Sequence, residues 1–291
     1  MFSRLLLAVV VGLVCAGAAM GVRSWWLSGT RDASAVGQQS ASARPTSVGA
    51  RLPVAQAQHS GRTPRASVAA DPLAGVTVGI DPGHNGRNYT DVAFIGHQVW
   101  NGRELEACNT TGTATDAGYS ESLFNFQVAG YLAADLRAAG ARVVLTRNDN
   151  AGVGPCVDDR ARTLNRSGAA VAIDIHADGG PASGRGFTIL EPVPDQANSA
   201  VVARSRSYGT DLRDAFLRTG MPTSTYDGDA GINFRDDLAG LNLTTVPQVL
   251  IECGNMRNST DAALLTSPRF QQQAARSIMS GMRAFLQRGP G

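Results

Sequence analysis

The sequence contains no lysine, and all 26 of its basic residues are arginine. Charged residues make up only 17% of the chain and aromatic residues 6%, and the formal net charge is +2. No run of basic residues alternates with aromatic ones, so the electrostatic footprint of a nucleic-acid-binding protein is missing. We therefore exclude nucleic acid as a partner and attribute the lack of lysine to coding bias.

Hydrophobic residues account for 43% of the 291 residues, and glycine is plentiful. This composition can bury a core and is not typical of a disordered chain. Length alone permits one large domain or two small ones. The sequence shows no internal repeat that would mark a second domain, so we expect a single globular body.

Residues 1–27 are typical of a targeting segment. An apolar run from residue 5 to residue 22 follows Arg4 and is closed by Arg23, Trp25 and Trp26. The run is just long enough to cross a bilayer and longer than most signal-peptide cores, so a cleaved signal peptide and an uncleaved membrane anchor both remain open. Either one predicts an extracytoplasmic protein, in the periplasm or cell wall, secreted or anchored to the cytoplasmic membrane.

Residues 28–71 are rich in Ser, Ala, Gln, Gly, Arg and Pro and have no apolar periodicity. Such a segment cannot offset the entropy of ordering, so we expect a disordered linker in which His59 is solvated. The folded domain then comprises residues 72–291.

Beyond the linker, short β-branched runs alternate with longer stretches of helical period. Strands are expected at residues 75–81, 142–146, 169–175, 187–191 and 247–252. Helices are expected at residues 121–139, 158–166, 199–219, 261–265 and 268–286. Strands separated by helices predict an α/β fold: a single domain with a twisted, largely parallel sheet covered by helices on both faces.

Three residues with useful chemistry fall at one edge of this predicted sheet, at the carboxyl ends of the strands, where ligands gather in such folds. His84 follows the first strand, His176 follows Ile175 directly, and Glu252 ends the last strand. Glu121 opens a helix and can present its carboxylate to the same edge. Two histidines and a glutamate form a common ligand set for catalytic zinc. From spacing alone, structural roles for these histidines remain open.

Four motifs follow one another along the domain: IDPGHNG (residues 80–86), SES (120–122), AIDIHAD (172–178) and VPQVLIECGNMRN (246–258). Together they resemble the zinc-dependent N-acetylmuramoyl-L-alanine amidases of the type-3 family, over residues 76–286. The resemblance implies one Zn²⁺ per chain, held by His84, Glu121 and His176, with Glu252 as the catalytic carboxylate. It further implies hydrolysis of the amide bond between N-acetylmuramic acid and L-alanine in peptidoglycan or muropeptides.

Some residues depart from the pattern of that family or carry an open role. Asp174 and Asp178 stand where the family usually has serine and asparagine around the second histidine. Asp174 shares a strand face with His176 and either orients that ligand or is a hydrogen-bonded core acid, and Asp81 carries the same two alternatives. For Arg160 we expect an ordinary position on a helix surface rather than a contact with a substrate carboxylate.

The interval 85–119 is long, polar and rich in Gly, Thr and Asn, so we expect a structureless loop that overhangs the zinc site and limits access to it. It contains His97, which is not expected among the ligands. Cys108 and Cys156 lie in two predicted loops. Because an exported protein reaches an oxidising compartment, we predict a disulfide between them. Cys253 should point away from Glu252 and be buried.

Two alternative functions remain. The first is another zinc-dependent cell-wall peptidase, a carboxypeptidase or endopeptidase, with the same ligands. The second is a non-catalytic wall-binding regulator of the same fold. We expect a monomer that contacts peptidoglycan or muropeptides and, if the first segment is uncleaved, the membrane; an activator protein remains open.

Overall fold

The computed structural model describes residues 70–289. The targeting segment expected at 1–27 and nearly all of the linker expected at 28–71 lie outside the described residues. Within 70–289 no helix is long and apolar enough to cross a bilayer.

A six-stranded sheet in the order β4-β1-β5-β8-β6-β7 forms the centre of the domain. Its strands are β1 (Thr77–Pro82), β4 (Arg142–Leu145), β5 (Val171–Asp178), β6 (Thr188–Pro192), β7 (Ile232–Arg235) and β8 (Gln248–Asn255). All neighbouring pairs are parallel except β6 and β8, which are antiparallel. Residues 171–175 of β5, all apolar except Asp174, are buried on both faces, as a central parallel strand requires.

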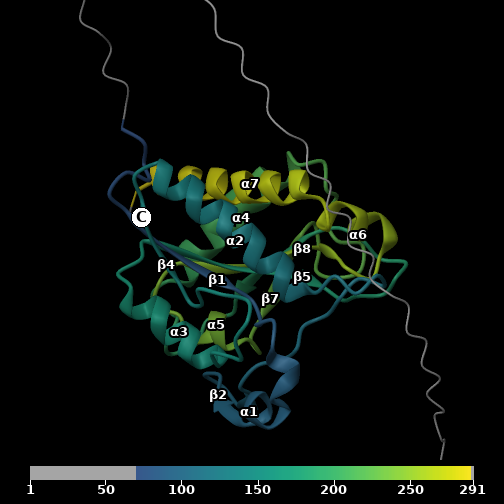
Figure 1. Ribbon diagram of the computed structural model, residues 1–291. Helices are drawn as coiled ribbons and strands as arrows, with labels where there is room; N and C mark the ends of the chain where they lie inside the picture. The colour runs from purple at the N-terminus through teal and green to yellow at the C-terminus, as the bar shows by residue number, and fades with distance from the viewer. Residues whose placement is uncertain (1–69, 290–291) are drawn as a thin grey trace, which may run out of the picture. The chain divides into compact units, whose positions relative to one another are not determined.

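Helices cover both faces of the sheet (Figure 1). One face carries α2 (Glu121–Ala138), α4 (Val202–Leu217) and α7 (Pro268–Gln287). The other carries α3 (Val157–Arg166) and the short α5 (Ala239–Asn242), while α6 (Ser259–Leu265) lies beside β8. The α/β fold with a largely parallel sheet, predicted from the alternation of strands and helices, is confirmed.

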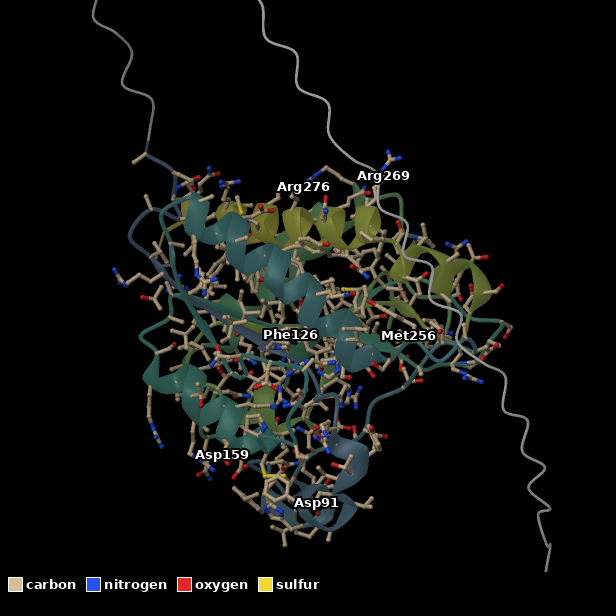
Figure 2. The ribbon with its side chains drawn as sticks, in the orientation of Figure 1. Asp91, Phe126, Asp159, Met256, Arg269 and Arg276 are labelled. Carbon is tan, nitrogen blue, oxygen red and sulfur yellow. A yellow bond between two sulfur atoms is a disulfide. The ribbon has the colours of Figure 1, made fainter. Side chains whose placement is uncertain are left out.

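The position of α7 illustrates how the layers are held together. Phe270, Ala274 and Ile278 recur at helical spacing and are buried against the core. Arg269 and Arg276 point outward from the same helix (Figure 2). Burying a side chain such as that of Ile278 stabilises the fold by about 1.5–3 kcal/mol, so this apolar stripe fixes which side of α7 meets the sheet.

The expectation of a structureless loop over residues 85–119 is wrong. The segment contains the 3-10 turn η1 (Asn88–Thr90), the short helix α1 (Val92–Gly96) and a hairpin of β2 (Gln98–Trp100) and β3 (Leu105–Ala107). Their order comes from anchoring to the body: Asn101 at the hairpin tip is fully buried and donates to the Asp237 carbonyl oxygen. Composition cannot reveal such long-range contacts.

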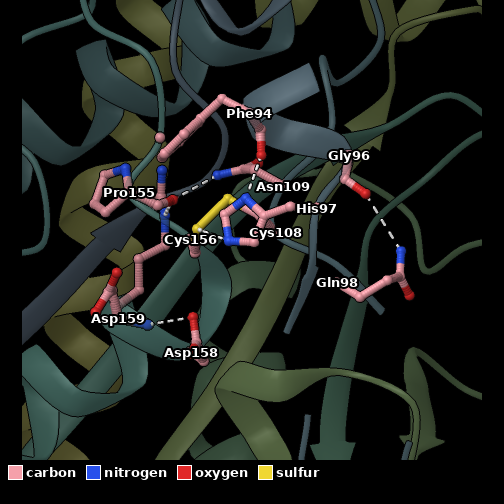
Figure 3. The surroundings of a disulfide bond; sticks show 12 residues. Phe94, Gly96, His97, Gln98, Cys108, Asn109, Pro155, Cys156, Asp158 and Asp159 are labelled. Carbon is pink, nitrogen blue, oxygen red and sulfur yellow. Dashed lines mark hydrogen bonds between the residues drawn. A yellow bond between two sulfur atoms is a disulfide. The ribbon is translucent and has the colours of Figure 1, made fainter. Parts of the chain in front are cut away.

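A disulfide joins this segment to the start of α3 (Figure 3). The sulfur atoms of Cys108 and Cys156 are bonded, and both residues are buried. The Asn109 side chain donates to the Pro155 carbonyl oxygen at 2.8 Å, and His97 Nε2 lies 3.6 Å from Cys156 Sγ. The base of the hairpin is therefore tied to the body covalently.

Candidate metal centre and active site

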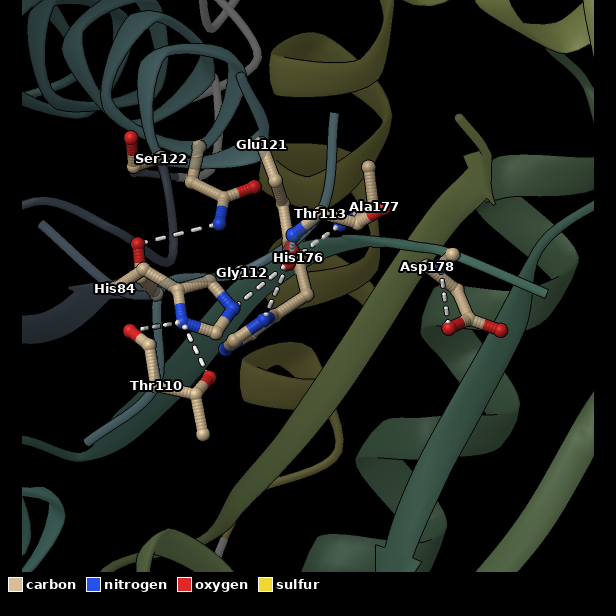
Figure 4. Close-up of polar contacts among 12 residues, drawn as sticks. His84, Thr110, Gly112, Thr113, Glu121, Ser122, His176, Ala177 and Asp178 are labelled. Carbon is tan, nitrogen blue, oxygen red and sulfur yellow. Dashed lines mark hydrogen bonds and ion pairs between the residues drawn. The ribbon is translucent and has the colours of Figure 1, made fainter. Parts of the chain in front are cut away.

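Three side chains from distant parts of the sequence converge above the sheet (Figure 4). His84 follows β1, Glu121 is the first residue of α2, and His176 lies in β5. Glu121 Oε1 is 3.1 Å from His84 Nε2 and 2.8 Å from His176 Nδ1. One ligand atom from each residue lies within 4.8 Å of the others, which is close enough for all three to hold one ion. His97 lies instead beside the disulfide.

The sequence suggested that His176 and Glu252 lie at strand ends, but in the structure both lie within strands. Strand β5 continues to Asp178 and β8 to Asn255, and the two residues face each other across this parallel pair. The strands extend further because their last residues still pair, with a register shift between His176 and Asp178. Both side chains therefore stand on the sheet surface rather than on a loop.

The residue before α2 places Glu121. The Ser120 hydroxyl accepts a hydrogen bond from the Leu123 N–H and so caps the helix. Glu121 then occupies the first turn, where the positive end of the helix dipole favours a carboxylate. Its Oε2 accepts a further bond from the Thr113 N–H at 2.9 Å.

His84 adopts a left-handed backbone conformation, with φ of 59°, which is unusual for a residue with a side chain. Two buried arginines hold this turn. Arg160 donates to the carbonyl oxygens of Pro82 and His84, and Arg147 donates to those of Pro82 and Gly83. Because strained conformations persist only where their surroundings fix them, these bonds are the reason that the His84 imidazole points at Glu121.

Gly83 is required by the close approach of the second histidine. A Cβ atom at this position would lie 2.2 Å from Nε2 of the His176 ring. The ring can therefore approach β1 only where the neighbouring residue lacks a side chain.

Each imidazole is held through the nitrogen that faces away from Glu121. His84 Nδ1 is 3.2 Å from the Thr110 carbonyl oxygen, and His176 Nε2 is 3.2 Å from Asp174 Oδ1. A partner on one nitrogen fixes the tautomer and leaves the other nitrogen free as a ligand. The two free nitrogens, His84 Nε2 and His176 Nδ1, are the ones that meet Glu121.

The charges of the cluster suit a cation. Burial opposes ionisation of Glu121, but His84 and His176 hold its pKa well below the usual range. Burial opposes protonation of His176, yet Asp174 and Glu121 raise its pKa well above the ordinary value. The negative charges of Asp174 and Glu121 thus favour a positive charge at this imidazole, and a divalent ion bound between the ligands would compensate the same negative charges.

Glu252 faces the cluster from β8 and is half-buried. Its Oε2 is enclosed and has no hydrogen-bond partner in the part of the chain that the structure describes. Burial raises the pKa of Glu252 well above its usual range; His176 opposes this, and the charges of Glu121 and Asp178 add to it. A carboxyl group whose pKa is raised holds a proton more readily and can pass it on to a leaving group.

Arg160 is not on the helix surface. It is 2% exposed, and its Nη1 makes a 2.6 Å ion pair with Asp81 Oδ1. The sequence did contain an indication that Arg160 is buried: it adjoins Ala161 and lies one helical turn before Leu164, and these two residues form the buried side of α3. Asp81 thus holds the arginine that holds His84, and no hydrogen bond or ion pair joins it to a histidine in the described region.

A pocket of about 460 Å³ opens from the cluster across the sheet surface. Its far end is apolar, with Leu190, Leu238, Leu241 and Leu250. The 85–119 segment forms one wall, to which the hairpin contributes Glu106. Burial raises the pKa of Glu106 to about 6, and its Oε1 accepts from the Ala239 N–H.

Three contributors to this site were not expected from the sequence. Thr110 orients His84, Thr113 binds Glu121, and Arg147 holds the turn before His84. Thr113 acts through its backbone N–H, and Thr110 through both its carbonyl oxygen and its hydroxyl, and neither contact leaves a local signal in the sequence. Arg147 follows the predicted strand 142–146, and its place at a strand end is the one indication the sequence offered.

Comparison with known proteins gives consistent results. A family model described as N-acetylmuramoyl-L-alanine amidase matches residues 78–284. The N-acetylmuramoyl-L-alanine amidase Rv3717 of Mycobacterium tuberculosis is 41% identical over 223 residues, covering 76% of this chain and 91% of that protein. The crystal structure of the amidase Ami1 from Mycobacterium smegmatis is 43% identical and superposes with a TM-score of 0.71 over 74% of this chain and 99% of that one. The crystal structure of Ami1 from Mycobacterium abscessus is 39% identical and superposes with a TM-score of 0.69 over 73% of this chain and 99% of that one.

Proposed function

The chain belongs to the N-acetylmuramoyl-L-alanine amidase family, and we propose that it is a zinc-dependent hydrolase of the amide bond between N-acetylmuramic acid and L-alanine in peptidoglycan. The observation that carries the zinc dependence is the convergence of His84 Nε2, Glu121 Oε1 and His176 Nδ1. Two imidazole nitrogens and one carboxylate leave a fourth position of a tetrahedral ion open, as catalytic zinc requires. The products are free stem peptides and a glycan without them.

His84, Glu121 and His176 would hold the ion, one per chain. When bound, zinc supplies Lewis acidity at the scissile carbonyl and lowers the pKa of water. Thr110 and Asp174 keep the two imidazoles in the required tautomers from behind. Asp81 acts one contact further away, through Arg160.

Glu252 is the proton-transfer group in this proposal. It lines the same pocket as the ligands and stands opposite His176 on the neighbouring strand. Its carboxylate takes a proton from the attacking water and returns it to the leaving amine, and its raised pKa suits both steps. The buried, unpartnered Oε2 atom is free to receive that proton.

The remaining elements of the proposal concern the setting of the domain. Residues 1–27 direct the chain out of the cytoplasm as a signal peptide or anchor, residues 28–71 form a tether, and residues 72–291 form the catalytic domain. The Cys108–Cys156 disulfide is consistent with an oxidising compartment. The protein acts as a monomer, and its 85–119 segment restricts the width of the pocket.

The test compares wild type with Glu252→Gln on purified peptidoglycan, followed by mass spectrometry of the soluble products. We expect the variant to keep one zinc per chain and to lose activity by a factor of about 10²–10⁴. Glu104→Gln, an exposed carboxyl on the hairpin, is the matched control and should retain full activity.

The products separate the proposal from its alternatives. Stem peptides that begin with L-alanine identify an amidase, whereas shortened stems still attached to the glycan identify a peptidase. No release by metal-loaded wild type would indicate a non-catalytic wall-binding protein. Full activity in Glu252→Gln, or loss of its zinc, would contradict the role given to this residue.

A further inference from the structure

A second hollow lies on the opposite face of the sheet from the catalytic pocket. Leu190 of β6 lines the catalytic pocket, and the next residue, Glu191, faces the other way because neighbouring side chains alternate along a strand. The hollow has a volume of about 600 Å³ and lies between α4 and the edge formed by β6 and β7. Its walls include Glu191, Arg206 and Phe234, and we call it the edge groove.

Glu191 is an unusual residue for this position. The residue is only 3% exposed, and no hydrogen bond or ion pair joins its carboxylate to another residue within 70–289. Neither carboxylate oxygen is among the fully enclosed atoms of this region that lack a partner, so the carboxylate opens to the groove. Burial raises its pKa to about 7, although Arg206 and Arg213 act in the opposite direction. Because nothing within the described residues donates to this carboxylate, a donor can reach it only from the groove.

The helix beside Glu191 is shaped to accept it. A Cβ atom at Gly209, in the middle of α4, would lie 2.1 Å from Glu191 Oε1. Glycine in a helix interior costs about 1 kcal/mol relative to alanine. Gly209 therefore makes room for this carboxylate at a cost to the helix.

A complementary donor and an aromatic surface stand next to the carboxyl group. Arg206 Nε is buried and has no partner among the described residues, while its Nη2 donates to the Pro192 carbonyl oxygen. The Arg206 guanidinium lies 4.6 Å from the centre of the Phe234 ring, which is 55% exposed at the mouth of the groove. The groove thus offers an acceptor, a donor and a flat apolar surface.

We propose that the edge groove binds an acetamido sugar of the glycan strand, as a second contact with the polymer away from the catalytic pocket. An acetamido N–H can donate to Glu191, its carbonyl oxygen can accept from the part of the Arg206 guanidinium that lines the groove, and the apolar face of a sugar ring can lie on Phe234. An amide meets the carboxylate and the guanidinium at once, which neither a cation nor an anion can do. The choice of this sugar rests on the proposed function, since the substrate polymer carries N-acetylated sugars.

The experiment titrates the full chain with the N-acetylglucosamine tetramer and follows backbone amide signals by NMR. We expect saturable shifts at residues 228–234 and around Arg206. Phe234→Ala and Glu191→Leu should each weaken binding at these signals about tenfold. Tyr89→Ala removes an aromatic ring that is 69% exposed outside the groove and should leave the affinity unchanged. Phe234→Ala replaces an exposed side chain, so it keeps the test decisive if Glu191→Leu does not fold.

Several results would overturn the proposal. They are the absence of shifts at the groove at millimolar tetramer, an unchanged affinity in Phe234→Ala, and equal shifts with the glucose tetramer, which lacks the acetamido group. Shifts at the groove with free stem peptide but not with the sugar would do the same. The tetramer contains no scissile amide of the proposed kind, so a protein that binds it at the groove but releases no stem peptides would sink the proposed function alone.

Discussion

Replacing Arg160 should test how the fold holds its first histidine. The guanidinium is 2% exposed, pairs with Asp81 at 2.6 Å and donates to the carbonyl oxygens of Pro82 and His84. Arg160→Ala leaves the Asp81 carboxylate buried without its cation, which costs about 3–5 kcal/mol. That is a large part of the roughly 5–15 kcal/mol by which domains are stable.

Denaturant unfolding at neutral pH measures this loss, and zinc titration measures its effect on the ligands. Arg162→Ala is the matched control on the same helix, because Arg162 is half exposed and its pair with Asp158 is worth about 0.5 kcal/mol. Arg160→Lys keeps the charge but loses the fork that spans two carbonyl oxygens, so it should fold and bind zinc about 10- to 100-fold more weakly. If Arg160→Ala unfolded at the same denaturant concentration as Arg162→Ala, the account of the His84 turn would be refuted.

Three further predictions concern other parts of the domain. Changing Cys108 and Cys156 together to serine should lower the free energy of unfolding by about 4 kcal/mol, because the disulfide closes a loop over a sequence separation of 48; a loss under about 1 kcal/mol would contradict this. Asp174→Asn should weaken zinc affinity about 10- to 100-fold with little change in thermal stability, and an unchanged affinity would mean that the residue does not orient His176. Folding raises the pKa of Glu191 from 4.5 to about 7, so the free energy of unfolding should be highest below about pH 4.5 and should fall as the pH rises through 7. We expect a fall of about 1–2 kcal/mol, less than the full shift would give because the groove is open to water. This fall should be absent in Glu191→Gln.

The order of strands and helices could be predicted because it depends on local patterns. The apolar period of residues 121–139 and the β-branched runs around residues 75–81 and 169–175 each carry their own signal, and the structure has α2, β1 and β5 there. The hairpin of β2 and β3 escaped prediction because its strands are three residues long and their order depends on contacts with remote loops. The edge strand β7 was missed for the same reason of length.

The sequence by itself determined the α/β class and the residue types of the candidate site, because apolar periodicity and motif order are properties of the chain. Only the tertiary structure decided that His84, Glu121 and His176 share one neighbourhood and that Arg160 is buried behind them. It also decided that Glu191 faces away from the catalytic pocket beside Gly209. The physical reason is that these relations join residues tens of positions apart, and their distances are set by how the sheet and helices pack rather than by any local preference.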